Sequence, residues 1–507
     1  MNIALLLDLV ADTLDDRVAL TDDVGDLTYA DLRALARAAA GGLAAEGART
    51  LAFADVGSRA VPAALFGAAW AGAAYAPLNF RLPAPSLEAQ VARLDRPHTV
   101  ASEELAGHLG DAPGDTTGRW LAGLVPGDGD DETPFDPEPA GPAVVLFTSG
   151  SSGTPKAAVL SHDNLLAYVM ETVEFAGAGE DEALLLAAPP FHIAGVAAVL
   201  TSVYSGRRLL PLSAFTPEGW LRTARDRRAT HAFLVPTMLA RVVQALAADP
   251  GLAVPTLRAI SYGGARMAMP VLEEALRLFP GVDFVNAYGL TETSSTIAVL
   301  GPEEHRLALS SDDPEVRRRL RSAGRPLPGV EVAIVDETGT PALAGVTGAI
   351  RVRGPQVGGA YLDTAPGVDD AGWLVTGDVG FLDDEGYLFV ESRADDVIIK
   401  GGENLSPSEI EDVLLRHPSV VAAAVVGVPD PEWGEVVAAA VVVEGGTDAA
   451  EAGAVAADLA GWVREHLGSF KAPTRVVVVE ELPSTATGKL LRRSVRDRLA
   501  AGDAPTD

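Results

Sequence analysis

Phe147-Thr-Ser-Gly-Ser-Ser-Gly-Thr-Pro-Lys156 is the stretch of this sequence on which the prediction of its fold depends. The apolar run Ala143–Phe147 predicts a strand before it, and Ser161-His-Asp-Asn164 predicts the start of a helix that continues to about Val173. Small residues let a backbone wrap closely around an anion, hydroxyl groups add donors, and a lysine adds positive charge. A strand, a glycine-rich loop and a helix in this order can present backbone N–H groups to phosphate.

Two better-known glycine motifs do not match this loop. Its spacing from Gly150 through Gly153 to Lys156 is GxxGxxK, whereas a Walker A loop requires GxxxxGK followed by Ser or Thr. The loop also lacks the GxSxG pattern of the nucleophile elbow, so an acyl hydrolase is not indicated. Outside a matching context, a loop rich in glycine and serine is an ordinary flexible connection. Its interpretation therefore depends on the rest of the chain.

The composition of the chain excludes several classes of partner and site. The 507 residues carry 39 Lys and Arg against 70 Asp and Glu, which gives a formal net charge of −31. Because nucleic-acid phosphates are held by clustered basic side chains, DNA and RNA are not expected partners. The chain contains no cysteine, which excludes disulfides, thiolate nucleophiles and cysteine-based metal sites. A hydrophobic share of 48% is typical of a globular protein.

Two long uncharged segments raise the question of membrane insertion. Ala60–Phe80 and Ala183–Gly206 each exceed the length that would flag a membrane span. Both are rich in alanine and glycine, carry prolines and lack basic flanks, which favours buried core segments. The N-terminal run MNIALLLDLVADTLDD has no basic region before its apolar residues and does not resemble a signal peptide. These features predict a soluble, cytoplasmic protein without a membrane span.

The last third of the chain divides into two regions. Short predicted strands separated by turn residues indicate a small β-rich subdomain over about residues 325–390. Beyond Asp395, alternating helix and strand patterns predict a compact α+β unit. Its first helix begins at Ser406-Pro-Ser-Glu409, where Ser406 and Glu409 have the spacing of a capping box and Pro407 takes the first helical position.

Lysine is rare in this chain. Only four of the 39 basic residues are lysines, namely Lys156, Lys400, Lys471 and Lys489. Because the chain uses arginine for general surface charge, each lysine is a candidate for a place that needs an ammonium group on a flexible stem. Chance is the alternative, and four residues do not exclude it.

Five further segments complete a recognisable pattern with the Gly/Ser loop. They are Ser261–Met267 (SYGGARM), Asn286–Glu292 (NAYGLTE), Val375–Asp378 (VTGD), Arg393–Gly402 (RADDVIIKGG) and Pro483–Lys489 (PSTATGK). In their order and spacing they resemble the motifs of the adenylate-forming enzymes, the superfamily of acyl-CoA synthetases, luciferases and peptide-synthetase adenylation domains. The resemblance spans nearly the whole chain and favours the acyl-CoA synthetase branch of the AMP-dependent acid–thiol ligases.

The resemblance implies a fold and a reaction. The fold is a multi-domain α/β fold, with a large N-terminal domain of mixed β-sheets flanked by helices (residues 1–394) that includes the β-rich subdomain. A small, mobile α+β C-terminal domain (residues 395–507) would rotate about a hinge at Asp395. The reaction uses ATP and Mg²⁺ to convert a carboxylic acid into acyl-AMP, and then transfers the acyl group to CoA with release of AMP.

The resemblance also implies a nucleotide site. Lys156 and the loop before it would hold the β- and γ-phosphates, and Thr291 would contact the α-phosphate. Asp378 would accept hydrogen bonds from the ribose hydroxyls, because a carboxylate has acceptors only. Glu292 would hold Mg²⁺, a hard cation that prefers carboxylate oxygen, with Thr148 as a second candidate ligand. Ordinary surface or turn carboxylates are the alternative for both acids. The residues expected to contact ATP or AMP are Thr148, Ser149, Gly150, Ser151, Ser152, Gly153, Thr154, Lys156, Gly263, Gly264, Ala265, Asn286, Ala287, Tyr288, Gly289, Leu290, Thr291, Asp378, Arg393 and Lys489.

Lys489 is the main candidate for catalysis, together with Thr291, Glu292 and His192. Adenylation joins a carboxylate oxygen to the α-phosphorus of ATP, and both partners are negatively charged. A lysine that bridges them would cancel this repulsion in the transition state. The alternative for Lys489 is a surface lysine whose charged end lies in water.

Pro189-Pro-Phe-His192 bears on the acid that is activated. Amino-acid-activating relatives usually carry an aspartate in this region, which pairs with the substrate's amino group, whereas acyl- and aryl-CoA ligases carry the Phe-His pair. His192 therefore favours a plain carboxylic acid and would line the acyl pocket with residues near Phe233 and Val235. A core histidine with satisfied hydrogen bonds is the alternative. The sequence identifies neither the acid nor the oligomeric state.

The acceptor of the acyl group is inferred from the C-terminal segments. Lys400-Gly-Gly-Glu403 resembles the stretch beside the pantetheine tunnel of CoA ligases, where Gly401 and Gly402 would let the thiol arm pass. No carrier-protein segment follows the C-terminal unit, so the thiol is expected on a separate molecule. CoA is the expected acceptor, and a carrier protein is the alternative.

Two positions depart from the family pattern. Ala157 stands where the phosphate loop usually continues with glycine, and Ser392 stands where glycine usually precedes Arg393. If either position needs a positive φ, a non-glycine residue strains the backbone and slows adenylation. A chain that performs mainly the thioester-forming half-reaction on a supplied acyl-adenylate is therefore an alternative. A catalytically inactive binding module is another, although the intact charged motif residues speak against it.

Overall fold

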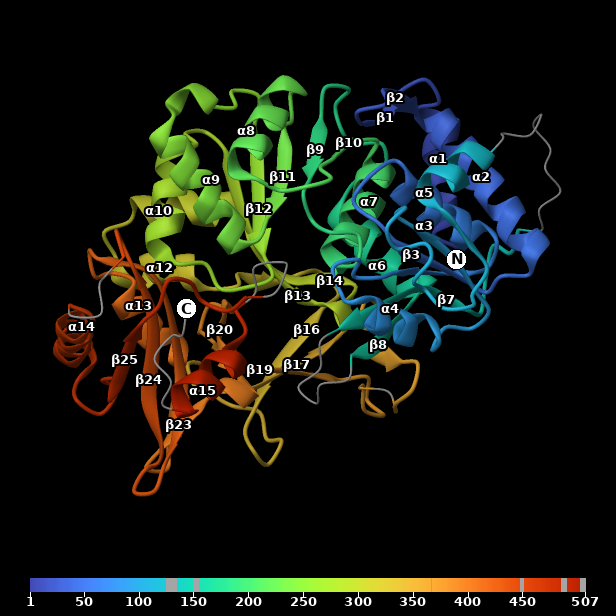
Figure 1. Ribbon diagram of the computed structural model, residues 1–507. Coiled ribbons are helices and arrows are strands. Elements are labelled where there is room, and N and C mark those ends of the chain that lie inside the picture. The colour runs from blue at the N-terminus through green and yellow to red at the C-terminus, as the bar shows by residue number, and fades with distance from the viewer. Residues whose placement is uncertain (125–134, 149–154, 366, 447–450, 485–489, 502–507) are drawn as a thin grey trace.

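The computed structural model describes residues 1–124, 135–148, 155–365, 367–446, 451–484 and 490–501. A large mixed sheet, called the central sheet below, forms the middle of the N-terminal part (Figure 1). In the order in which they pair, its strands are β15 (Arg325–Pro326), β14 (Ser295–Leu300), β13 (Asp283–Leu290), β12 (Ala259–Gly263), β11 (His231–Leu234), β9 (Ala183–Leu186), β10 (Arg208–Pro211), β1 (Val18–Thr21) and β2 (Asp26–Thr28). The strands from β13 to β1 are parallel, and β14 and β2 flank them antiparallel.

A second sheet contains the strands on either side of the Gly/Ser loop. Its strands, in pairing order, are β18 (Ala360–Tyr361), β8 (Lys156–Ser161), β7 (Pro142–Thr148), β4 (Ala74–Pro77), β3 (Thr50–Ala54), β5 (Pro97–Ala101) and β6 (Gly114–Thr116). The strands from β7 to β6 are parallel, whereas β7, β8 and β18 pair antiparallel. The second sheet therefore ends in an antiparallel edge next to the loop.

Helices and the two sheets form alternating layers. The helices that share one core with both sheets are α1 (Ala4–Thr13), α2 (Tyr29–Glu46), α3 (Ala60–Trp70), α6 (His162–Thr172) and α7 (Ile193–Ser205). The other face of the central sheet packs on α8 (Pro217–Asp226), α9 (Pro236–Ala248) and α10 (Met269–Leu278), and that of the second sheet on α4 (Ala84–Val91). Leu51 and Phe53 face the shared core while Ala52 and Ala54 face α4, as the two-residue period of a strand requires.

The long uncharged segments are part of these layers. α3 is buried from Ala60 through Ala69, and β9 and α7 carry the second segment into the shared core. The prediction of buried core segments is confirmed. Within the described ranges, no helix has both the length and the apolar character that crossing a bilayer requires.

The rest of the chain forms two smaller sheets. The small sheet consists of β16 (Glu331–Val335), β17 (Gly348–Arg353), β19 (Leu374–Leu382) and β20 (Leu388–Arg393). The C-terminal sheet consists of β22 (Glu403–Leu405), β21 (Ile398–Lys400), β24 (Gly434–Val443), β23 (Val420–Asp430) and β25 (Arg475–Val478). One of its faces packs on α13 (Pro407–Leu414) and α14 (Ala452–Leu467), and the other on α15 (Arg492–Ala501). Shorter helical segments are α5 (Thr117–Gly123), η1 (Pro250–Leu252), α11 (Pro302–Ser310), α12 (Pro314–Arg318) and η3 (Arg319–Arg321).

The structure confirms the predicted fold class. Large mixed sheets flanked by helices precede a β-rich region, and an α+β unit follows it. Figure 1 shows this C-terminal unit, in orange and red, beside the small sheet and below α9 and α10. The small sheet covers most of the predicted β-rich region, but β15 and β18 leave that region to pair with the two large sheets.

The segment after the Gly/Ser loop differs from the prediction. The loop was predicted to lead directly into a helix, but Lys156–Ser161 forms β8, and α6 begins only at His162. Ala157, Ala158 and Leu160 are buried, which explains why this segment joins the second sheet. The helix start itself is confirmed, because Ser161 and Asn164 form a capping box. Any phosphate donors therefore belong to the connection between two antiparallel strands rather than to a helix N-terminus.

The start of α13 also differs from the prediction. Pro407 takes the first helical position as predicted, but Ser406 makes no side-chain cap hydrogen bond. Its hydroxyl donates to the carbonyl oxygen of Glu391 at 3.5 Å, and Lys471 Nζ donates to Glu409 Oε2 at 2.6 Å. The predicted capping box is therefore wrong, since tertiary partners take both side chains.

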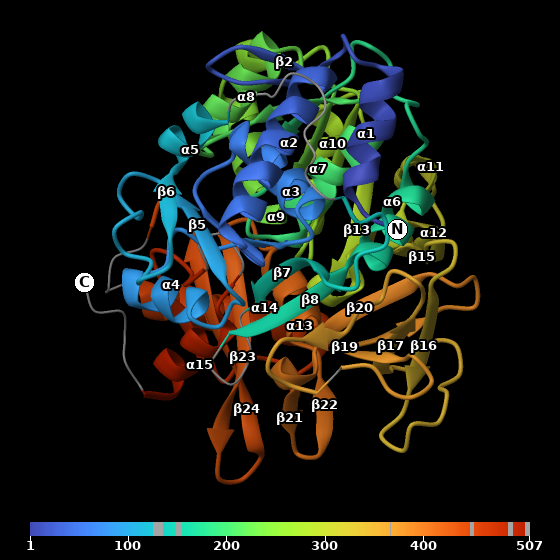
Figure 2. The ribbon, with the colours of Figure 1, turned by 90° about the vertical axis from the view of Figure 1, so that its right-hand side faces the viewer.

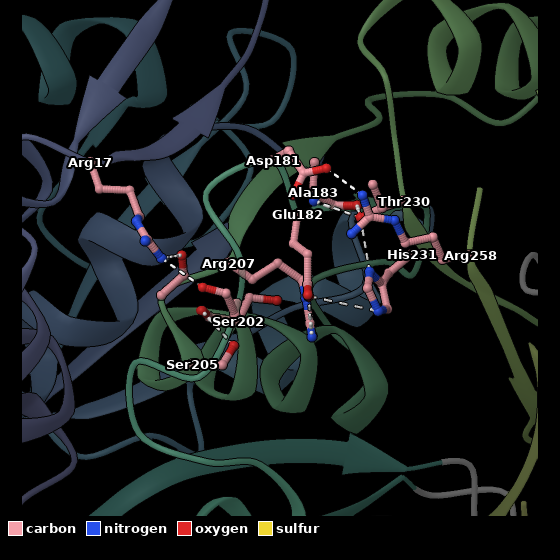
Figure 3. A network of polar contacts seen from close by, with 12 residues as sticks. Arg17, Asp181, Glu182, Ala183, Ser202, Ser205, Arg207, Thr230, His231 and Arg258 are labelled. Atoms are coloured by element: carbon pink, nitrogen blue, oxygen red, sulfur yellow. Dashed lines mark hydrogen bonds and ion pairs between the residues drawn. The ribbon is translucent and has the colours of Figure 1, made fainter. Parts of the chain in front are cut away.

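A polar network closes the end of the central sheet where β9, β11 and β12 begin (Figure 3). Arg207 Nε and Nη2 donate to Glu182 Oε2 at 3.0 and 2.9 Å, and His231 Nε2 lies 3.8 Å from the same oxygen. Burial, followed by the repulsion of Arg207, lowers the pKa of His231 to about 4. His231 is therefore neutral at pH 7.

We expect this neutral histidine to make folding sensitive to mild acid. A histidine in the unfolded chain has a pKa near 6.5. Between about pH 6.5 and 4, His231 therefore binds a proton in the unfolded state but not in the folded state. The contribution of His231 to the free energy of unfolding is fully present above pH 6.5 and is lost as the pH falls from 6.5 to 4. Between these pH values, the free energy of unfolding of the His231→Gln variant should therefore fall by about 1–3 kcal/mol less than that of the wild type. Denaturant unfolding at pH 7 and pH 4.5 measures this, and parallel pH profiles for the two proteins would contradict it.

Candidate active site

One group of predicted site residues lies at the carboxyl ends of the parallel strands of the central sheet. His192 follows β9, Val235 follows β11, Gly263 ends β12 and Thr291 follows β13. Since these strands are parallel neighbours, their carboxyl ends lie along one edge of the sheet. In α/β sheets, ligands bind outside this edge.

Glycine is required where β12 leaves the sheet. A Cβ atom on Gly263 would lie 2.1 Å from the carbonyl oxygen of Ala287 on β13. Gly264, the next residue, has a φ of +80°, which favours glycine. The backbone of Gly263–Ala265 can therefore turn sharply at the edge of the sheet, and Gly264 and Ala265 are exposed there.

Glu292 lies in a tight turn directly after β13. This turn is η2 (Thr291–Thr293), and Tyr361 Oη donates to Glu292 Oε1 at 2.8 Å. Burial, followed by the negative charge of Glu292, raises the pKa of Tyr361 above its usual value, so the phenol keeps its proton. A carboxylate with one oxygen held by a neutral donor has acceptor capacity left on both oxygens. This donor set fits Mg²⁺, which proteins usually bind through one or two carboxylates together with phosphate oxygens.

Lys156 lies next to this turn, at the start of β8. Its side chain is exposed, and Nζ lies 5.4 Å from the centroid of the Tyr361 ring. Thr148, which ends β7, pairs with Lys156 across the two strands, and its hydroxyl donates to the Lys156 carbonyl oxygen at 3.4 Å. Lys156, at one end of the Gly/Ser loop, thus lies next to Tyr361, which donates to Glu292, and Thr148, at the other end, pairs with Lys156. Residues Ser149–Thr154 of the predicted phosphate site lie outside the described residues.

Asp378 is the buried carboxylate of the site. It lies on β19 and is 5% exposed. Tyr288 Oη donates to Asp378 Oδ2 at 2.6 Å, and Arg393 Nε lies 2.8 Å from Asp378 Oδ1. Burial and the charge of Asp378 raise the pKa of Tyr288 well above its usual value, so Tyr288 stays a donor. Because β13 carries Tyr288 and leads into Glu292, it connects Asp378 to the turn described above.

The other predicted residues of β13 have strand roles. Ala287, Tyr288, Gly289 and Leu290 pair with β14 and are half-buried. Asn286 Nδ2 donates to the carbonyl oxygen of Ser322 at 2.8 Å, so its amide already has a partner within the fold.

His192 is not a core histidine. It is exposed and lies directly before α7, while its neighbour Phe191 is buried. Phe191 packs edge-on against Phe80, with ring centroids 5.5 Å apart, and lies 5.1 Å from the His192 ring. An exposed imidazole beside an aromatic pair at the end of β9 is consistent with a wall of an acyl pocket. Phe233 is half-buried on β11, two residues before Val235.

The predicted CoA-side residues lie in the C-terminal unit. Lys400 is 6% exposed, and its Nζ donates to the carbonyl oxygen of Phe470 at 2.6 Å. Gly401 and Gly402 have φ values of +58° and +84° and form the turn between β21 and β22, and Glu403 follows them exposed. The structure therefore does not bring these residues to the candidate nucleotide site. Figure 2 shows β21 and β22 at the lower end of the molecule, beside β23 and β24.

The structure describes the predicted hinge at Asp395 but not the predicted catalytic lysine. Asp395 is exposed in η4 (Ala394–Asp396), which links β20 of the small sheet to β21 of the C-terminal sheet. Lys489 lies outside the described residues. The chain on either side of it forms a bridge between Ser484 and Leu490, and Leu491 N donates to the Pro483 carbonyl oxygen at 2.8 Å.

Ala157 and Ser392 do not strain the backbone. Both lie within strands, β8 and β20, and neither is among the described non-glycine residues with a positive φ. The Ala157 side chain is buried in the core under α4. The structural reason for expecting slow adenylation is therefore removed.

Two residues that the sequence did not single out lie at this site. Tyr361 contacts both Glu292 and Lys156. Arg93 Nη1 donates to the carbonyl oxygen of Pro155 at 2.8 Å, and its Nε donates to Asp363 Oδ2 at 2.8 Å. No local motif marks either residue, because their partners are distant in sequence.

Comparison with known proteins finds relatives along nearly the whole chain. The family model described as AMP-binding enzyme matches residues 7–362, and the model of the AMP-binding enzyme C-terminal domain matches residues 409–489. A feruloyl-CoA synthase from Amycolatopsis sp is 35% identical over 486 residues, which are 93% of this chain and 94% of that protein. A fatty acid–[acyl-carrier-protein] ligase, ScoC, from Streptomyces coeruleorubidus is 32% identical over 455 residues, 86% of this chain and 83% of that protein.

A solved structure shares the fold. The o-succinylbenzoate coenzyme A synthetase from Bacillus subtilis, in complex with ATP and magnesium ion, superposes with a TM-score of 0.82 at 28% identity. The match covers 97% of this chain and 99% of that one. The similarity thus includes both the large N-terminal part and the C-terminal unit.

Proposed function

Because the chain belongs to the AMP-binding enzyme family, as the match over residues 7–362 shows, we propose that it is an ATP- and Mg²⁺-dependent acid–thiol ligase that makes acyl-CoA from a carboxylic acid. The observation that carries this proposal is the meeting of three charged groups from distant segments. The Tyr288 hydroxyl donates to Asp378, the Tyr361 hydroxyl donates to Glu292, and the Tyr361 ring lies against the Lys156 ammonium. These contacts lie at one edge of the central sheet. A ribose acceptor, a cation ligand and a phosphate-binding ammonium are what an adenylating site needs.

The first half-reaction forms an acyl-adenylate. A carboxylate oxygen of the acid attacks the α-phosphorus of ATP, the bond between the α-phosphorus and the bridging oxygen breaks, and pyrophosphate leaves. We assign Thr291 to the α-phosphate and Lys489 to the two negatively charged reactants. Glu292 would hold Mg²⁺, and the bound cation would supply positive charge to the phosphates. We likewise propose that the other residues predicted for the nucleotide site contact ATP or AMP, and that those predicted for the acyl pocket contact the acid.

The second half-reaction forms the thioester. The sulfur of CoA attacks the acyl carbon, the bond from this carbon to the AMP oxygen breaks, and AMP leaves, while the thiol proton passes to solvent. This step is proposed to need a rotation of residues 395–507 against residues 1–394 about Asp395, which would bring the Lys400–Glu403 face to the site. The exposure of Asp395 and of the turn at Gly401 and Gly402 supports this proposal. Two stable domain arrangements are typical of such closures.

An ion pair connects the C-terminal unit to the N-terminal part of the chain. Arg266 Nη2, directly after the turn of Gly263–Ala265, lies 2.6 Å from Asp412 Oδ2 on α13, and Arg321 Nη1 lies 3.7 Å from the same oxygen. Ser408 Oγ also donates to the carbonyl oxygen of Glu391 at 2.7 Å. A rotation about Asp395 would break these contacts. Because the Lys400–Glu403 face is not at the site in this arrangement, we assign this arrangement to adenylation, and the contacts favour it.

Asp412→Asn should therefore slow adenylation about two- to fivefold, because a partly exposed ion pair is worth up to about 1 kcal/mol. Thioester formation from a premade acyl-adenylate should not slow. Rates of the two half-reactions, measured separately, test this. Glu273→Gln is the matched control, since Glu273 pairs with Arg317 at 3.8 Å within the N-terminal part. An equal loss in both half-reactions of the Asp412 variant would contradict the expected effect.

A carrier protein is the second candidate acceptor. The similarity to a ligase of acyl-carrier protein favours it, whereas the similarity to a feruloyl-CoA synthase favours CoA. The latter also makes aromatic acids the first candidates for the substrate, and the aromatic pair of Phe80 and Phe191 beside His192 supports this choice.

Exchange of labelled pyrophosphate into ATP tests the proposed function. In the absence of CoA, we expect exchange that depends on Mg²⁺ and on one class of carboxylic acid, because only a reversible adenylation returns pyrophosphate to ATP. ATP binding without exchange for any acid, together with no acyl-CoA, would instead support a binding module.

A further inference from the structure

We propose that Tyr361 is a positioning residue of this site, whose hydroxyl orients the Glu292 carboxylate and whose ring places the Lys156 ammonium. This inference rests on the function proposed above and goes beyond it, because Tyr361 lies in none of the motifs that led to that function. It assigns two separate tasks to one side chain, which a pair of variants can separate.

Tyr361 has a partner on each of two sides. Its hydroxyl donates to Glu292 Oε1 at 2.8 Å, and Lys156 Nζ lies 5.4 Å from its ring centroid, within the range of a cation–π interaction. The half-buried ring lies at the edge of the second sheet, where Tyr361 pairs with Ala158 and Leu362 N donates to the Ala157 carbonyl oxygen at 3.0 Å. The strand that carries Lys156 therefore also fixes Tyr361.

The same chain segment holds the backbone of the Glu292 turn. Gly358 N donates to the Glu292 carbonyl oxygen at 2.8 Å. Gln356, which is 2% exposed, donates from Nε2 to the carbonyl oxygens of Thr293 at 3.0 Å and Thr296 at 2.6 Å. Residues 356–361, called the support segment below, thus contact both the main chain and the carboxylate of this turn.

This turn needs such support because the backbone directly after it is strained. Ser294 and Ser295 have φ values of 55° and 115°, in a region that favours glycine. Residues held in this way cost on the order of 1–3 kcal/mol each and persist only where their surroundings impose the conformation. The Ser294 hydroxyl donates to the Gln356 carbonyl oxygen at 2.9 Å, so the support segment also contacts the strained residues. Glu292 is therefore held in one place before any ligand arrives.

Arg93 connects the residues directly after the support segment to the Gly/Ser loop. It donates to Asp363, two residues beyond Tyr361, and to the Pro155 carbonyl oxygen, each at 2.8 Å. Its guanidinium carbon also lies 5.1 Å from the ring centroid of Phe147, at the other end of the loop. Lys156 and Tyr361 thus keep their relative position through a side chain that belongs to neither strand.

The two tasks follow from the chemistry of the partners. Mg²⁺ demands near-octahedral geometry, so a carboxylate ligand that is already oriented loses less freedom on binding. Partners that orient a metal ligand typically change metal affinity by 10–100-fold when they are removed. The Lys156 ammonium interacts with the ring face and not with the hydroxyl, so its position should survive the loss of the hydroxyl alone.

Tyr361→Phe and Tyr361→Leu separate the two tasks, with calorimetric titration of ATP as the readout. For Tyr361→Phe, we expect wild-type ATP affinity without Mg²⁺ and a half-saturating Mg²⁺ concentration raised about tenfold or more. For Tyr361→Leu, we expect the same Mg²⁺ effect and, without Mg²⁺, a further two- to fivefold loss of ATP affinity. Tyr387→Phe is the matched control. It removes the hydroxyl of another ring that lies against a cation, since the guanidinium carbon of Arg325 is 4.4 Å from the Tyr387 ring centroid. This control should leave both ATP affinity and the Mg²⁺ requirement unchanged.

A double-mutant cycle with Glu292→Gln identifies the partner of the hydroxyl. We expect the double variant Tyr361→Phe with Glu292→Gln to need no more Mg²⁺ than Glu292→Gln alone, since the hydroxyl is proposed to act on Mg²⁺ only through the Glu292 carboxylate, which Glu292→Gln removes. A wild-type Mg²⁺ requirement for Tyr361→Phe, or additive losses in the cycle, would overturn the role of the hydroxyl. Equal ATP affinities of the Phe and Leu variants without Mg²⁺ would overturn the role of the ring. A wild-type protein that does not bind ATP would instead refute the proposed function.

Discussion

Lys489→Ala should abolish acyl-adenylate formation while leaving thioester formation from a supplied acyl-adenylate close to the wild-type rate. The first half-reaction brings two negatively charged groups together, and loss of one group that stabilises such a transition state typically costs about 10²–10³ in rate. In the second half-reaction the acyl carbon is already activated, so the same ammonium is not needed there. Stopped assays of each half-reaction, with AMP and thioester quantified separately, measure the two rates.

Lys471→Ala is the control for this variant. Lys471 is also in the C-terminal unit, but its Nζ donates to Glu409 Oε2 at 2.6 Å, so the change removes an ion pair within that unit. We expect a much smaller loss of adenylation than for Lys489→Ala. If Lys489→Ala lowered both half-reactions equally, Lys489 would not have the role proposed for it.

Asp378→Ala should produce the second large effect, a loss of ATP affinity of about 10- to 100-fold. Hydrogen bonds to a charged group contribute about 1.5–3 kcal/mol each, and a tenfold change in affinity corresponds to about 1.4 kcal/mol. Asp378 is proposed to accept two hydrogen bonds from the ribose, in addition to its contacts with Tyr288 and Arg393. Calorimetric titration with ATP measures the effect.

Two variants separate the ribose contact from the structural contacts of Asp378. Tyr288→Phe removes a donor to Asp378 but keeps the carboxylate, so ATP affinity should fall much less. Asp378→Asn keeps the size of the side chain and one acceptor oxygen, which guards against unfolding caused by leaving Arg393 unpaired. Unchanged ATP affinity in a folded Asp378→Ala protein would refute the assignment of Asp378 to the ribose.

Local patterns predicted much of the fold correctly. The capping box at Ser161 and Asn164 involves residues only three positions apart, and the proline start of α13 at Pro407 is equally local. The resemblance supplied the division into large sheets, a β-rich region and an α+β unit. These features depend on short-range chemistry or on a whole pattern of motifs, both of which are visible in one sequence.

The failures share a physical cause, which is tertiary contact. β8 was missed because the six residues Lys156–Ser161 become a strand only through pairing with β7 and β18. Ser406 and Glu409 have the spacing of a capping box, but Glu391 and Lys471 take their side chains. Local spacing shows which interactions are available, and packing decides which of them form.

The candidate site was predicted in part. The motifs that follow β12 and β13 lie at one edge of the central sheet, yet the motifs gave no sign that Tyr361 lies against Glu292, 69 positions earlier in the chain. Arg93 was missed for the same reason, since Asp363 is 270 positions away. The strain expected at Ala157 and Ser392 came from the family pattern, and it is absent because both residues lie in ordinary strands.

The formation of acyl-CoA by the purified protein tests the central claim most directly. Mass spectrometry would follow a panel of carboxylic acids, beginning with aromatic acids, incubated with ATP, Mg²⁺ and CoA, beside the matching premade acyl-adenylates with CoA alone. We predict acyl-CoA in both series for the same class of acid, with AMP released. Thioester from the premade adenylates alone would contradict the claim that this chain carries out the complete two-step ligation.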